Sequence, residues 1–228
     1  MPRVLKPFAL FDFDDTLIRG DSIVKLCFYA VRKGWMNPLR LLPVGVHSAL
    51  YLSGLSTPQK AKQAALRFLK GRSEDEVNRF AEDFCRTVLI PRLYPDGVKE
   101  LKARAESGCE VWLVSASPEF YLKPLMKHLP LSCVVGTRLY VEDGKHTGLM
   151  AGENCRGVEK PLRIAEMLAA CGDMLDYADS YGFGDSAGDA PMLALCGHKV
   201  AVYPRKKLLK ALDGADGVTQ VQWKGAGR

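Results

Sequence analysis

The sequence predicts an α/β fold: a doubly wound parallel sheet with an all-helical cap inserted into it. Short apolar runs that are typical of buried strands alternate with helical patterns from residue 91 onward, and this alternation implies parallel crossover connections. Residues 22–89 show a helical pattern without a convincing strand. The 228 residues suffice for one domain with a large insertion, and a composition with 47% hydrophobic and 25% charged residues is that of an ordinary globular protein.

An apolar run that ends in carboxylates predicts the first buried strand at residues 6–12. The helical pattern that follows has three breaks, which divide it into roughly four helices. These breaks lie at Asn37–Pro38, residues 56–58 and residues 71–73. Ser73 and Glu76 have the spacing of a capping box at the start of the last helix. We therefore expect the cap to cover residues 21–90.

Strands and helices alternate in the remainder of the chain. The predicted strands cover residues 109–117, 180–186 and 198–204, and the predicted helices cover residues 95–107, 118–128, 158–171 and 190–196. Asp143-Gly144, between two alternating runs, is the strongest hairpin signal. The last fifteen residues, GADGVTQVQWKGAGR, predict an edge strand and a loose tail. Residues 1–20 and 91–228 are thus predicted to form the core.

The predicted cap carries an unbalanced charge. Between Ser22 and Ser73 there is no Asp or Glu, and there are nine basic residues: Lys25, Arg32, Lys33, Arg40, Lys60, Lys62, Arg67, Lys70 and Arg72. Such a field attracts a phosphorylated substrate, an anionic membrane surface or nucleic acid, although a solvated basic face is an equal alternative. Residues 41–59 are uncharged, but their prolines and glycines make a poor transmembrane helix. A buried cap helix and an interfacial membrane segment are the two interpretations of this stretch.

The cysteine pattern and the start of the chain indicate a compartment. The seven cysteines are scattered, odd in number and never form C-x-x-C, which argues against a disulfide framework or a zinc site. The first fifteen residues turn acidic too early for a signal peptide. We therefore expect a cytoplasmic protein in a reducing environment.

Polar groups follow three of the predicted strands at their carboxyl ends, where open α/β sheets bind ligands. They are Asp12 and Asp14 after the first strand, Ser115 and Ser117 after the second, and Asp185 and Asp189 after the strand that ends in FGDS; Lys160 begins a helix that can point to the same end. Carboxylates, a cation and hydroxyls together suit Mg²⁺ and phosphate. An aspartate is ionised near pH 7 and can attack phosphorus without a base. Mg²⁺ and a lysine offset its repulsion from an anionic phosphate, and a second carboxyl can transfer protons.

Two other kinds of site are excluded by their spacing. A calcium-binding EF-hand loop that starts at Asp12 requires Gly at position 17 and Glu at position 23, where the sequence has Leu17 and Ile23. The stretch GFGDSAG, residues 182–188, spaces its glycines as G-x-G-x-x-x-G, and it places Asp185 where a pyrophosphate would bind. It is therefore not a dinucleotide-binding loop.

At these residues the sequence resembles the haloacid dehalogenase-like (HAD) phosphatases, and within them subgroup IB, which is similar to phosphoserine phosphatase. The matching motifs occur in the family's order: DFDDT at residues 12–16, Ser115 in LVSAS, Lys160 in GVEKPLRI, and GDSAGDAPML at residues 184–193. The helical insertion sits where that subgroup carries its cap. The resemblance implies a Rossmann-like core, an aspartyl-phosphate mechanism and Mg²⁺ as the cofactor.

The resemblance also implies roles for single residues. Asp12 is implied to be the nucleophile and Asp14 the acid/base, while Ser115 hydrogen-bonds a phosphoryl oxygen. Mg²⁺ is implied to bind Asp12, the backbone carbonyl of Asp14, and Asp185. Asp189 is implied to support the metal site and Lys160, which in turn steadies the nucleophile and the phosphate.

The expected substrate contacts lie beside these catalytic residues. They are Ser115, Ala116, Arg19, Asp21 and Ser22, with Arg67 and Arg72 as further candidates. Asp15 receives no role, and Ser117 is expected to cap the helix that opens at Pro118. We expect a small-molecule phosphomonoester as the partner, no nucleic acid, and peripheral membrane contact through the basic cap as an option. The sequence does not indicate an oligomeric state.

Two departures from the family pattern bear on the substrate. Phosphoserine phosphatases have a glutamate after the first motif, where this chain has Asp21, and an asparagine before the last aspartate, where it has Gly188. Both weaken the prediction of phosphoserine, and the last motif looks more like the branch similar to phosphatidylglycerophosphate phosphatases. We expect a Mg²⁺-dependent hydrolase of a small phosphorylated metabolite. The alternatives are a phospholipid head-group phosphatase acting on phosphatidylglycerophosphate or lysophosphatidate, a phosphotransferase, and a non-catalytic binding module.

Overall fold

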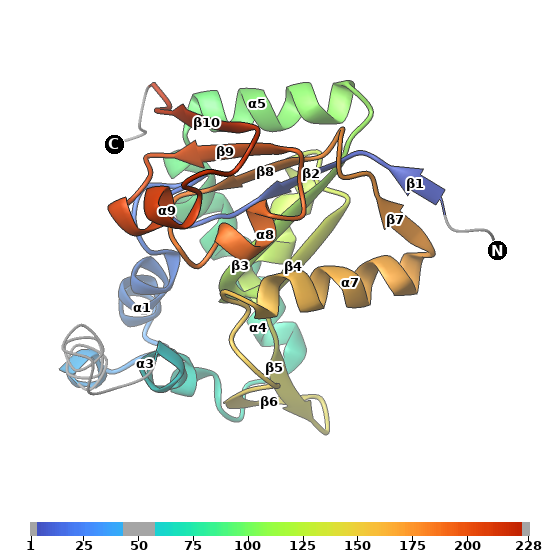
Figure 1. Cartoon of the computed structure of the whole chain (residues 1–228). Helices are drawn as coiled ribbons and strands as arrows, with labels where there is room; N and C mark the ends of the chain where they lie inside the picture. The colour runs from blue at the N-terminus through green and yellow to red at the C-terminus, as the bar shows by residue number, and fades with distance from the viewer. Residues whose placement is uncertain (1–3, 43–57, 225–228) are drawn as a thin grey trace.

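The computed structural model describes residues 4–42 and 58–224, and a six-stranded parallel sheet forms its centre (Figure 1). The strand order is β10-β9-β8-β2-β3-β4, and every neighbouring pair is parallel. The bounds of these strands are β2 Phe8–Phe11, β3 Glu110–Pro118, β4 Cys133–Thr137, β8 Tyr181–Gly184, β9 His198–Val202 and β10 Val218–Val221. The predicted doubly wound α/β fold is confirmed, including the C-terminal edge strand.

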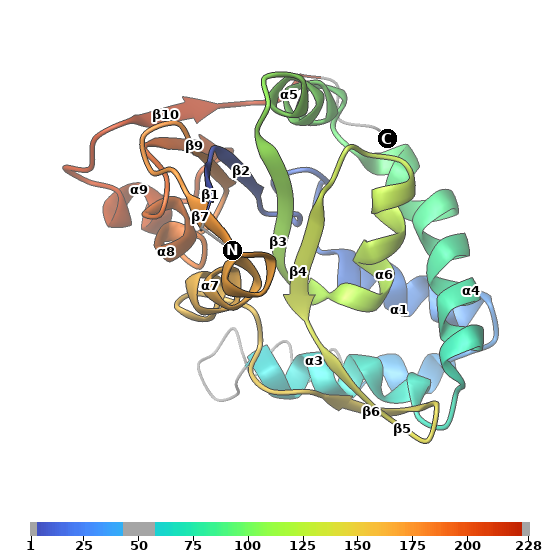
Figure 2. The ribbon, with the colours of Figure 1, turned by 90° about the vertical axis from the view of Figure 1, so that its right-hand side faces the viewer.

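Alternate residues of the central strand β2 join two different hydrophobic cores, because successive side chains of a strand point to opposite faces. Ala9 and Phe11 lie in one core with α5 and α6, whereas Phe8 and Leu10 lie in the other with α7, α8 and α9. The helix bounds are α5 Pro95–Glu106, α6 Glu119–Leu122, α7 Glu159–Cys171, α8 Ala190–Leu193 and α9 Lys206–Ala211. The sheet is therefore covered on both faces, as Figure 2 shows.

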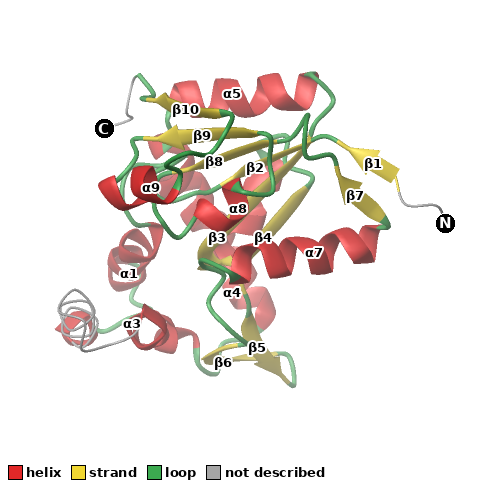
Figure 3. Cartoon of the chain, in the orientation of Figure 1, coloured by secondary structure: helices red, strands yellow, loops and turns green. Residues whose placement is uncertain are grey.

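The segment between β2 and β3 contains helices and no strand within its described parts (Figure 3). Its elements are α1 Ser22–Arg32, η1 Pro38–Arg40, α3 Pro58–Leu66, η2 Arg67–Leu69, α4 Glu74–Phe84, the π-helical η3 Cys85–Leu89 and η4 Ile90–Arg92. The predicted capping box opens α4, where Ser73 N donates to Glu76 Oε2 over 2.9 Å and Glu76 N donates to Ser73 Oγ over 3.3 Å. Most of the uncharged stretch 41–59 lies outside the described residues. The two interpretations of this stretch, a buried cap helix and an interfacial membrane segment, therefore stay predictions. We refer to the segment 21–90 as the cap.

A β-hairpin leaves the core and pairs with the cap. Its strands are β5 Leu139–Glu142 and β6 Lys145–Met150, and its turn residues Asp143 and Gly144 both have positive φ, as the predicted tight turn requires. The cap linker before α4 runs antiparallel to β6 at Ser73 and Lys145. Figure 2 shows α3 alongside β6, so the hairpin lies against the cap although the chain builds it from the core.

Two predicted elements differ from the observed ones. The first strand is interrupted at Pro7, and the preceding residues form β1 (Val4–Lys6), which pairs in parallel with β7 (Asp173–Leu175) in a separate small sheet. The predicted helix 118–128 consists of the short α6 and a 3₁₀ segment, Lys123–Lys127. Pro124 near the start of that segment has no amide hydrogen for an α-helical bond, which accounts for the change.

Two further findings concern the cysteines and the helices. All seven cysteines are free. Among the residues that the structure describes, no helix has the length and apolar character that a bilayer crossing requires.

Candidate active site

The carboxyl ends of β2, β3 and β8 meet at one edge of the sheet, and a cavity of about 300 Å³ lies between this edge and the cap. Asp12 follows β2, Ser115 lies near the end of β3, and Asp185 follows β8. The backbone of Asp12 extends the sheet, since its N–H donates to Phe183 O over 2.9 Å. We call this space the carboxylate cavity. The structure thus brings together the residues that the three predicted strand ends were expected to deliver.

Lys160 is the buried centre of the site. Its Nζ donates to Asp12 Oδ1 over 2.7 Å, to Asp189 Oδ1 over 2.6 Å and to Val114 O over 2.9 Å. These three bonds use all three ammonium protons. Burial alone would lower the pKa of Lys160, but Asp12 and then Asp189 raise it above its usual value. Lys160 is therefore a permanent cation that ties the first carboxylate to the last one.

The carboxylates of Asp12, Asp185 and Asp189 fit a divalent cation. Each offers an oxygen, and the three oxygens lie within 4.8 Å of one another. Asp185 Oδ2 is buried and accepts no hydrogen bond from the described residues, although Arg205 Nε lies 2.9 Å away as an ion pair. Burial, followed by the Asp189 charge, raises the pKa of Asp185 to about 7. The raised pKa means that ionised Asp185 is unfavourable in this buried position. A hard cation such as Mg²⁺ would stabilise the ionised form, because it prefers carboxylate oxygens.

Asp189 is more fully hydrogen-bonded than the other two carboxylates, since Asp12 Oδ2 accepts only one long bond, from Thr16 Oγ1 over 3.3 Å, and Asp185 Oδ2 accepts none from the described residues. Asp189 Oδ1 accepts from Lys160, and Asp189 Oδ2 accepts from Ser186 N and from Ser186 Oγ, each over 2.9 Å. Asp12 and Asp185 are thus the better candidates for direct metal ligands. Asp189 holds Lys160 and the loop that carries Asp185.

Asp14 is held apart from this cluster by two hydrogen bonds. Ser22 N donates to its Oδ1 over 2.7 Å, and Ser117 Oγ donates to its Oδ2 over 2.6 Å. Burial, followed by the Asp21 charge, raises the pKa of Asp14 to about 6. Ser117 was expected to cap α6; that prediction is wrong, since α6 has no side-chain cap and Ser117 orients Asp14 instead. Ser22 is buried and also contacts Tyr121 OH at 2.9 Å, so it supports Asp14 and does not line the cavity.

Ser115 and Ala116 line the carboxylate cavity on the core side. Ser115 is buried, and its Oγ accepts a hydrogen bond from Ser117 N over 3.1 Å. The carbonyl oxygen of Ala116 accepts a hydrogen bond from Thr137 Oγ1 over 2.5 Å and another from Lys62 of the cap. The carboxyl end of β3 is therefore fixed by its neighbours on both sides.

The other expected substrate contacts are spread more widely. Asp21 lines the cavity and caps α1, accepting a hydrogen bond from Ile23 N over 2.8 Å. Arg19 is exposed, and neither it nor Arg67 nor Arg72 lines the cavity. The guanidinium of Arg72 instead stacks over the Trp35 ring, 4.4 Å from its centroid.

Asp15, which had no predicted role, braces the loop after β2. It adopts a positive φ of 56°, accepts a hydrogen bond from Gly20 N over 2.6 Å, and pairs with Arg205 Nη2 over 2.6 Å. Because Arg205 also pairs with Asp185, this arginine links the two loops that carry the carboxylates. The left-handed backbone and the ion pair together explain why a third carboxylate stands at this position.

Among the cavity residues that were not predicted, four carry a cationic or amide side chain: Lys62, Asn154, Arg156 and Arg205. One feature of the sequence could have indicated two of them: Asn154 and Arg156 lie within six residues of Lys160. The structure also accounts for Gly188, one of the two departures of this sequence from the family pattern. A Cβ atom at Gly188 would lie 2.9 Å from Arg156 Nε, so the glycine leaves the space that this arginine occupies.

The contact between Gly184 and Asp189 leads to a first prediction. A Cβ atom at Gly184 would lie 2.5 Å from the Cβ and 2.9 Å from the Cγ of Asp189. Gly184→Ala therefore has to displace Asp189 and with it Lys160, and we expect kcat/KM for a phosphomonoester to fall about 100-fold, as misplaced catalytic groups do. Gly172→Ala is the control: this glycine has a φ of +75° at the end of α7, so the substitution costs stability without touching the site. Equal activities of the two variants would contradict the prediction.

The chain is similar to known proteins over most of its length. A family model described as haloacid dehalogenase-like hydrolase matches residues 9–194. The protein CicA of Caulobacter vibrioides is 29% identical over 83% of this chain and 82% of its own length. A histidinol-phosphatase of Neisseria meningitidis is 27% identical over 90% of this chain and 94% of its own length. A phosphoserine phosphatase of Mycobacterium tuberculosis is 28% identical over 91% of this chain and 68% of its own length.

Among solved structures, a protein of unknown function from Bordetella pertussis has the same fold. Its TM-score is 0.84 at 24% sequence identity, and the alignment covers 97% of this chain and 99% of that one. The similarity extends over the sheet and the inserted segment together, since nearly all of both chains is aligned.

Proposed function

Since the chain belongs to the haloacid dehalogenase-like hydrolases, we propose that it is a Mg²⁺-dependent phosphomonoesterase that forms a phosphoryl-enzyme at Asp12. The observation that carries this proposal is the position of Asp12, whose carboxylate lines the cavity, accepts a hydrogen bond from Lys160 and has an oxygen within 4.8 Å of oxygens of Asp185 and Asp189. The neighbouring carboxyl, Asp14, is oriented separately by Ser22 and Ser117. One carboxylate is thus available to attack and the other to transfer protons.

The proposed reaction has two displacements at phosphorus. An Asp12 oxygen attacks the phosphorus, the bond from phosphorus to the leaving oxygen breaks, and protonated Asp14 gives its proton to that oxygen. Water then attacks the phosphorus of the aspartyl-phosphate and gives a proton to Asp14, while the bond from phosphorus to the Asp12 oxygen breaks. Phosphate leaves, and the Asp12 carboxylate and the protonated Asp14 are restored. Ser115 lines the cavity and has a hydroxyl proton that it could donate to a phosphoryl oxygen, whereas Lys160 would act through its charge from behind Asp12. Mg²⁺ bound by Asp12 and Asp185 would supply further charge neutralisation at those oxygens.

The size of the cavity supports a small substrate. A volume of about 300 Å³ is at the lower end of the range for ligand pockets. The cap side combines Asp21 and Lys62 with the apolar side chains of Ile23, Val24 and Cys27. Two of the relatives are named for small phosphomonoesters, histidinol phosphate and phosphoserine. We therefore propose a small phosphorylated metabolite with polar groups as the substrate.

A phospholipid head group is the second candidate, and one observation favours it. Val24 lines the cavity and is 46% exposed, and Phe28, one turn further along α1, is 62% exposed. These side chains form an apolar path from the cavity wall to the surface of a basic cap, which suits an acyl chain beside an anionic head group.

A phosphate-release screen tests both candidates. With Mg²⁺ present, we expect release from histidinol phosphate, phosphoserine or another small phosphomonoester, and loss of this activity with EDTA. Preferential hydrolysis of lysophosphatidate or phosphatidylglycerophosphate, with sedimentation on anionic liposomes, would select the lipid candidate. Phosphate release that falls when acceptor alcohols are added, as product shifts to them, would indicate a phosphotransferase. No Mg²⁺-dependent turnover of any of these compounds would overturn the proposal.

A further inference from the structure

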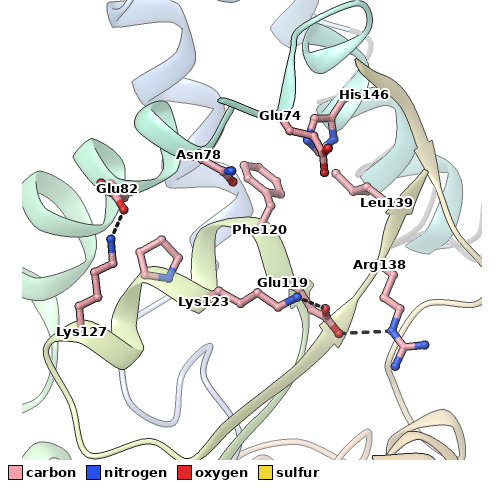
Figure 4. A pocket seen from close by; sticks show the side chains of 11 residues that line it. Glu74, Asn78, Glu82, Glu119, Phe120, Lys123, Lys127, Arg138, Leu139 and His146 are labelled. Carbon is pink, nitrogen blue, oxygen red and sulfur yellow. Dashed lines mark hydrogen bonds and ion pairs between the residues drawn. The ribbon is translucent and has the colours of Figure 1, made fainter. Parts of the chain in front are cut away.

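A second cavity, of about 590 Å³, lies between α4, the segment after β3 and the β5–β6 hairpin (Figure 4). The lysine and arginine side chains that line it pair with carboxylates of the same cavity: Lys123 with Glu119 over 3.0 Å, Arg138 with Glu119 over 3.6 Å, and Lys127 with Glu82. These cations are therefore occupied by neighbouring carboxylates and are not arranged to bind an anionic ligand.

The segment after β2, residues 12–18, folds back on itself as a tight turn, and we call it the nucleophile loop. The amides of Thr16, Leu17 and Ile18 all donate to the carbonyl oxygen of Phe13, over 3.3, 2.8 and 3.1 Å. Like the end of a helix, such a turn leaves its last carbonyl groups without a partner inside the turn. Thr16 and Leu17 are fully buried, so their carbonyl oxygens require partners from elsewhere in the chain.

Two distant segments supply these partners. The indole N–H of Trp223 donates to Thr16 O over 2.8 Å, and the backbone N–H of Tyr94 donates to Leu17 O over 2.9 Å. The Thr16 hydroxyl in turn donates to Asp12 Oδ2 over 3.3 Å. Neither Trp223 nor Thr16 lines the carboxylate cavity. Two successive contacts therefore connect the segment after β10 with the carboxylate that is proposed to attack phosphorus, and they do so without touching the substrate.

The indole of Trp223 is held in place by contacts of its own. The Tyr203 hydroxyl donates to the carbonyl oxygen of Trp223, and Lys224 N donates to Asp96 Oδ2 over 2.6 Å. Gly97 of α5 leaves room for the ring, because a Cβ atom at Gly97 would lie 3.3 Å from Trp223 Nε1. These contacts fix the backbone on both sides of the tryptophan and direct its N–H toward the nucleophile loop.

Tyr203, which binds the Trp223 carbonyl, has a left-handed backbone with a φ of +41°. This conformation is unusual for an aromatic residue and persists only where the surrounding contacts determine it. Two residues later, Arg205 pairs with Asp15 and with Asp185. The strained turn after β9 therefore sends one side chain to the C-terminal segment and the next cation to the loops that carry the carboxylates.

We propose that Trp223 is a positioning residue for the nucleophile: its N–H holds the Thr16 carbonyl, and the Thr16 hydroxyl thereby keeps Asp12 Oδ2 in place. Lys160 holds the other oxygen, Asp12 Oδ1, over 2.7 Å. One contact on each oxygen fixes the plane of the carboxylate. The attacking oxygen has to be aligned with the phosphorus, and small misplacements lower the rate steeply. The effect of Trp223 on turnover rests on the proposed phosphatase function.

Hydrogen exchange without any substrate tests the hold on the nucleophile loop directly. Trp223→Phe keeps an aromatic ring but removes the N–H, so the buried Thr16 carbonyl loses its partner. We expect the amides of Leu17 and Ile18 to exchange about tenfold faster, while the amide of Leu10 in β2 keeps its rate. This pattern would show a local loosening of the loop in an otherwise intact sheet.

Trp35→Phe is the matched control for this experiment. Trp35 is also half-buried, but it belongs to the cap, where its ring stacks on Phe80 with the centroids 4.2 Å apart. The same substitution at this position should leave exchange of the nucleophile loop unchanged. Unchanged exchange of Leu17 and Ile18 in Trp223→Phe would overturn the proposal. An equal increase at Leu10 would overturn it as well, because it would indicate a general loss of stability.

Kinetics test whether the effect reaches Asp12 through Thr16. We expect Trp223→Phe to lower kcat for a phosphomonoester about tenfold and to change KM by less than about twofold, because the substrate touches neither residue. Thr16→Val removes the hydroxyl and should have the same effect, and the double variant should lose no more than either single one. Additive losses, or a higher KM with unchanged kcat, would overturn the proposal. If the wild-type protein hydrolyses no phosphomonoester, the proposed function fails, whereas the exchange experiment still decides whether Trp223 holds the loop.

Discussion

Asp12→Asn is expected to abolish phosphate release, lowering kcat/KM by roughly 10⁴-fold or more, because an amide cannot form the acyl phosphate on which the two-step reaction depends. The substitution changes one oxygen to nitrogen and nearly conserves shape. Lys160 would retain its hydrogen bonds to Asp189 and to Val114. The protein should therefore remain folded, and the loss should be one of chemistry.

The measurement combines kinetics with detection of the intermediate. Wild-type protein quenched in acid during turnover should carry one phosphoryl group on the peptide that contains Asp12, and the Asp12→Asn variant should carry none. Asp15→Asn is a suitable control, since Asp15 lies three residues away and pairs with Arg205 instead of facing the reaction. An Asp12→Asn variant that retains Mg²⁺-dependent hydrolysis of an aryl phosphate would show that the nucleophile is another group.

The sequence was sufficient to predict where Asp12, Asp185 and Lys160 would meet. The carboxyl ends of parallel strands converge at one edge, so a polar residue placed directly after an apolar run has a predictable position. Lys160 begins a helix that returns to the same edge, and its contact with Asp12 at 2.7 Å spans 148 residues of the chain. These contacts follow from the order of strands and helices along the chain. The hydrophobic periodicity of the sequence is sufficient to predict that order.

Lys62 and Asn154 could not be predicted in the same way. Nine basic residues lie between Ser22 and Ser73 without an acidic one, and helical periodicity alone does not show which of them faces the core. The pairing of Lys62 with Asn154, a hydrogen bond of 2.5 Å, requires knowledge of how the cap sits on the sheet, which depends on tertiary packing. A local pattern carries no information about this arrangement.

Ser117 shows how a local preference was outweighed by a buried charge. Serine directly before Pro118 is a favourable helix cap, worth about 1 kcal/mol. A hydrogen bond to the buried Asp14 carboxylate is charge-assisted and stronger, and the observed 2.6 Å contact goes to Asp14.

The short strands β1 and β7, with three residues each, were missed for a different reason: so few residues show no periodicity.

Lys160→Met is expected to have the largest effect on stability, lowering the free energy of unfolding by about 3–5 kcal/mol, because it leaves two buried carboxylates without their cation. Asp12 and Asp189 both hydrogen-bond to Lys160, whose side chain is 1% exposed. Methionine nearly conserves the length of the side chain, so the loss should come from charge more than from packing. Urea denaturation in the presence of EDTA measures the free energy of unfolding of the variant and of the wild-type protein.

A second buried lysine of the same chain provides the control for this prediction. Lys199 donates to the carbonyl oxygens of Cys196 and Asp216 over 2.8 Å and 3.1 Å and to the hydroxyl of Tyr177 over 3.3 Å, so Lys199→Met leaves only neutral groups without this partner. We expect Lys199→Met to lower the free energy of unfolding by about 1–3 kcal/mol. In the Lys160→Met background, Asp189→Asn should restore part of the stability, since it removes one of the two repelling charges. If Lys160→Met destabilises no more than Lys199→Met, or Asp189→Asn restores nothing, then charge compensation is not what holds this site together.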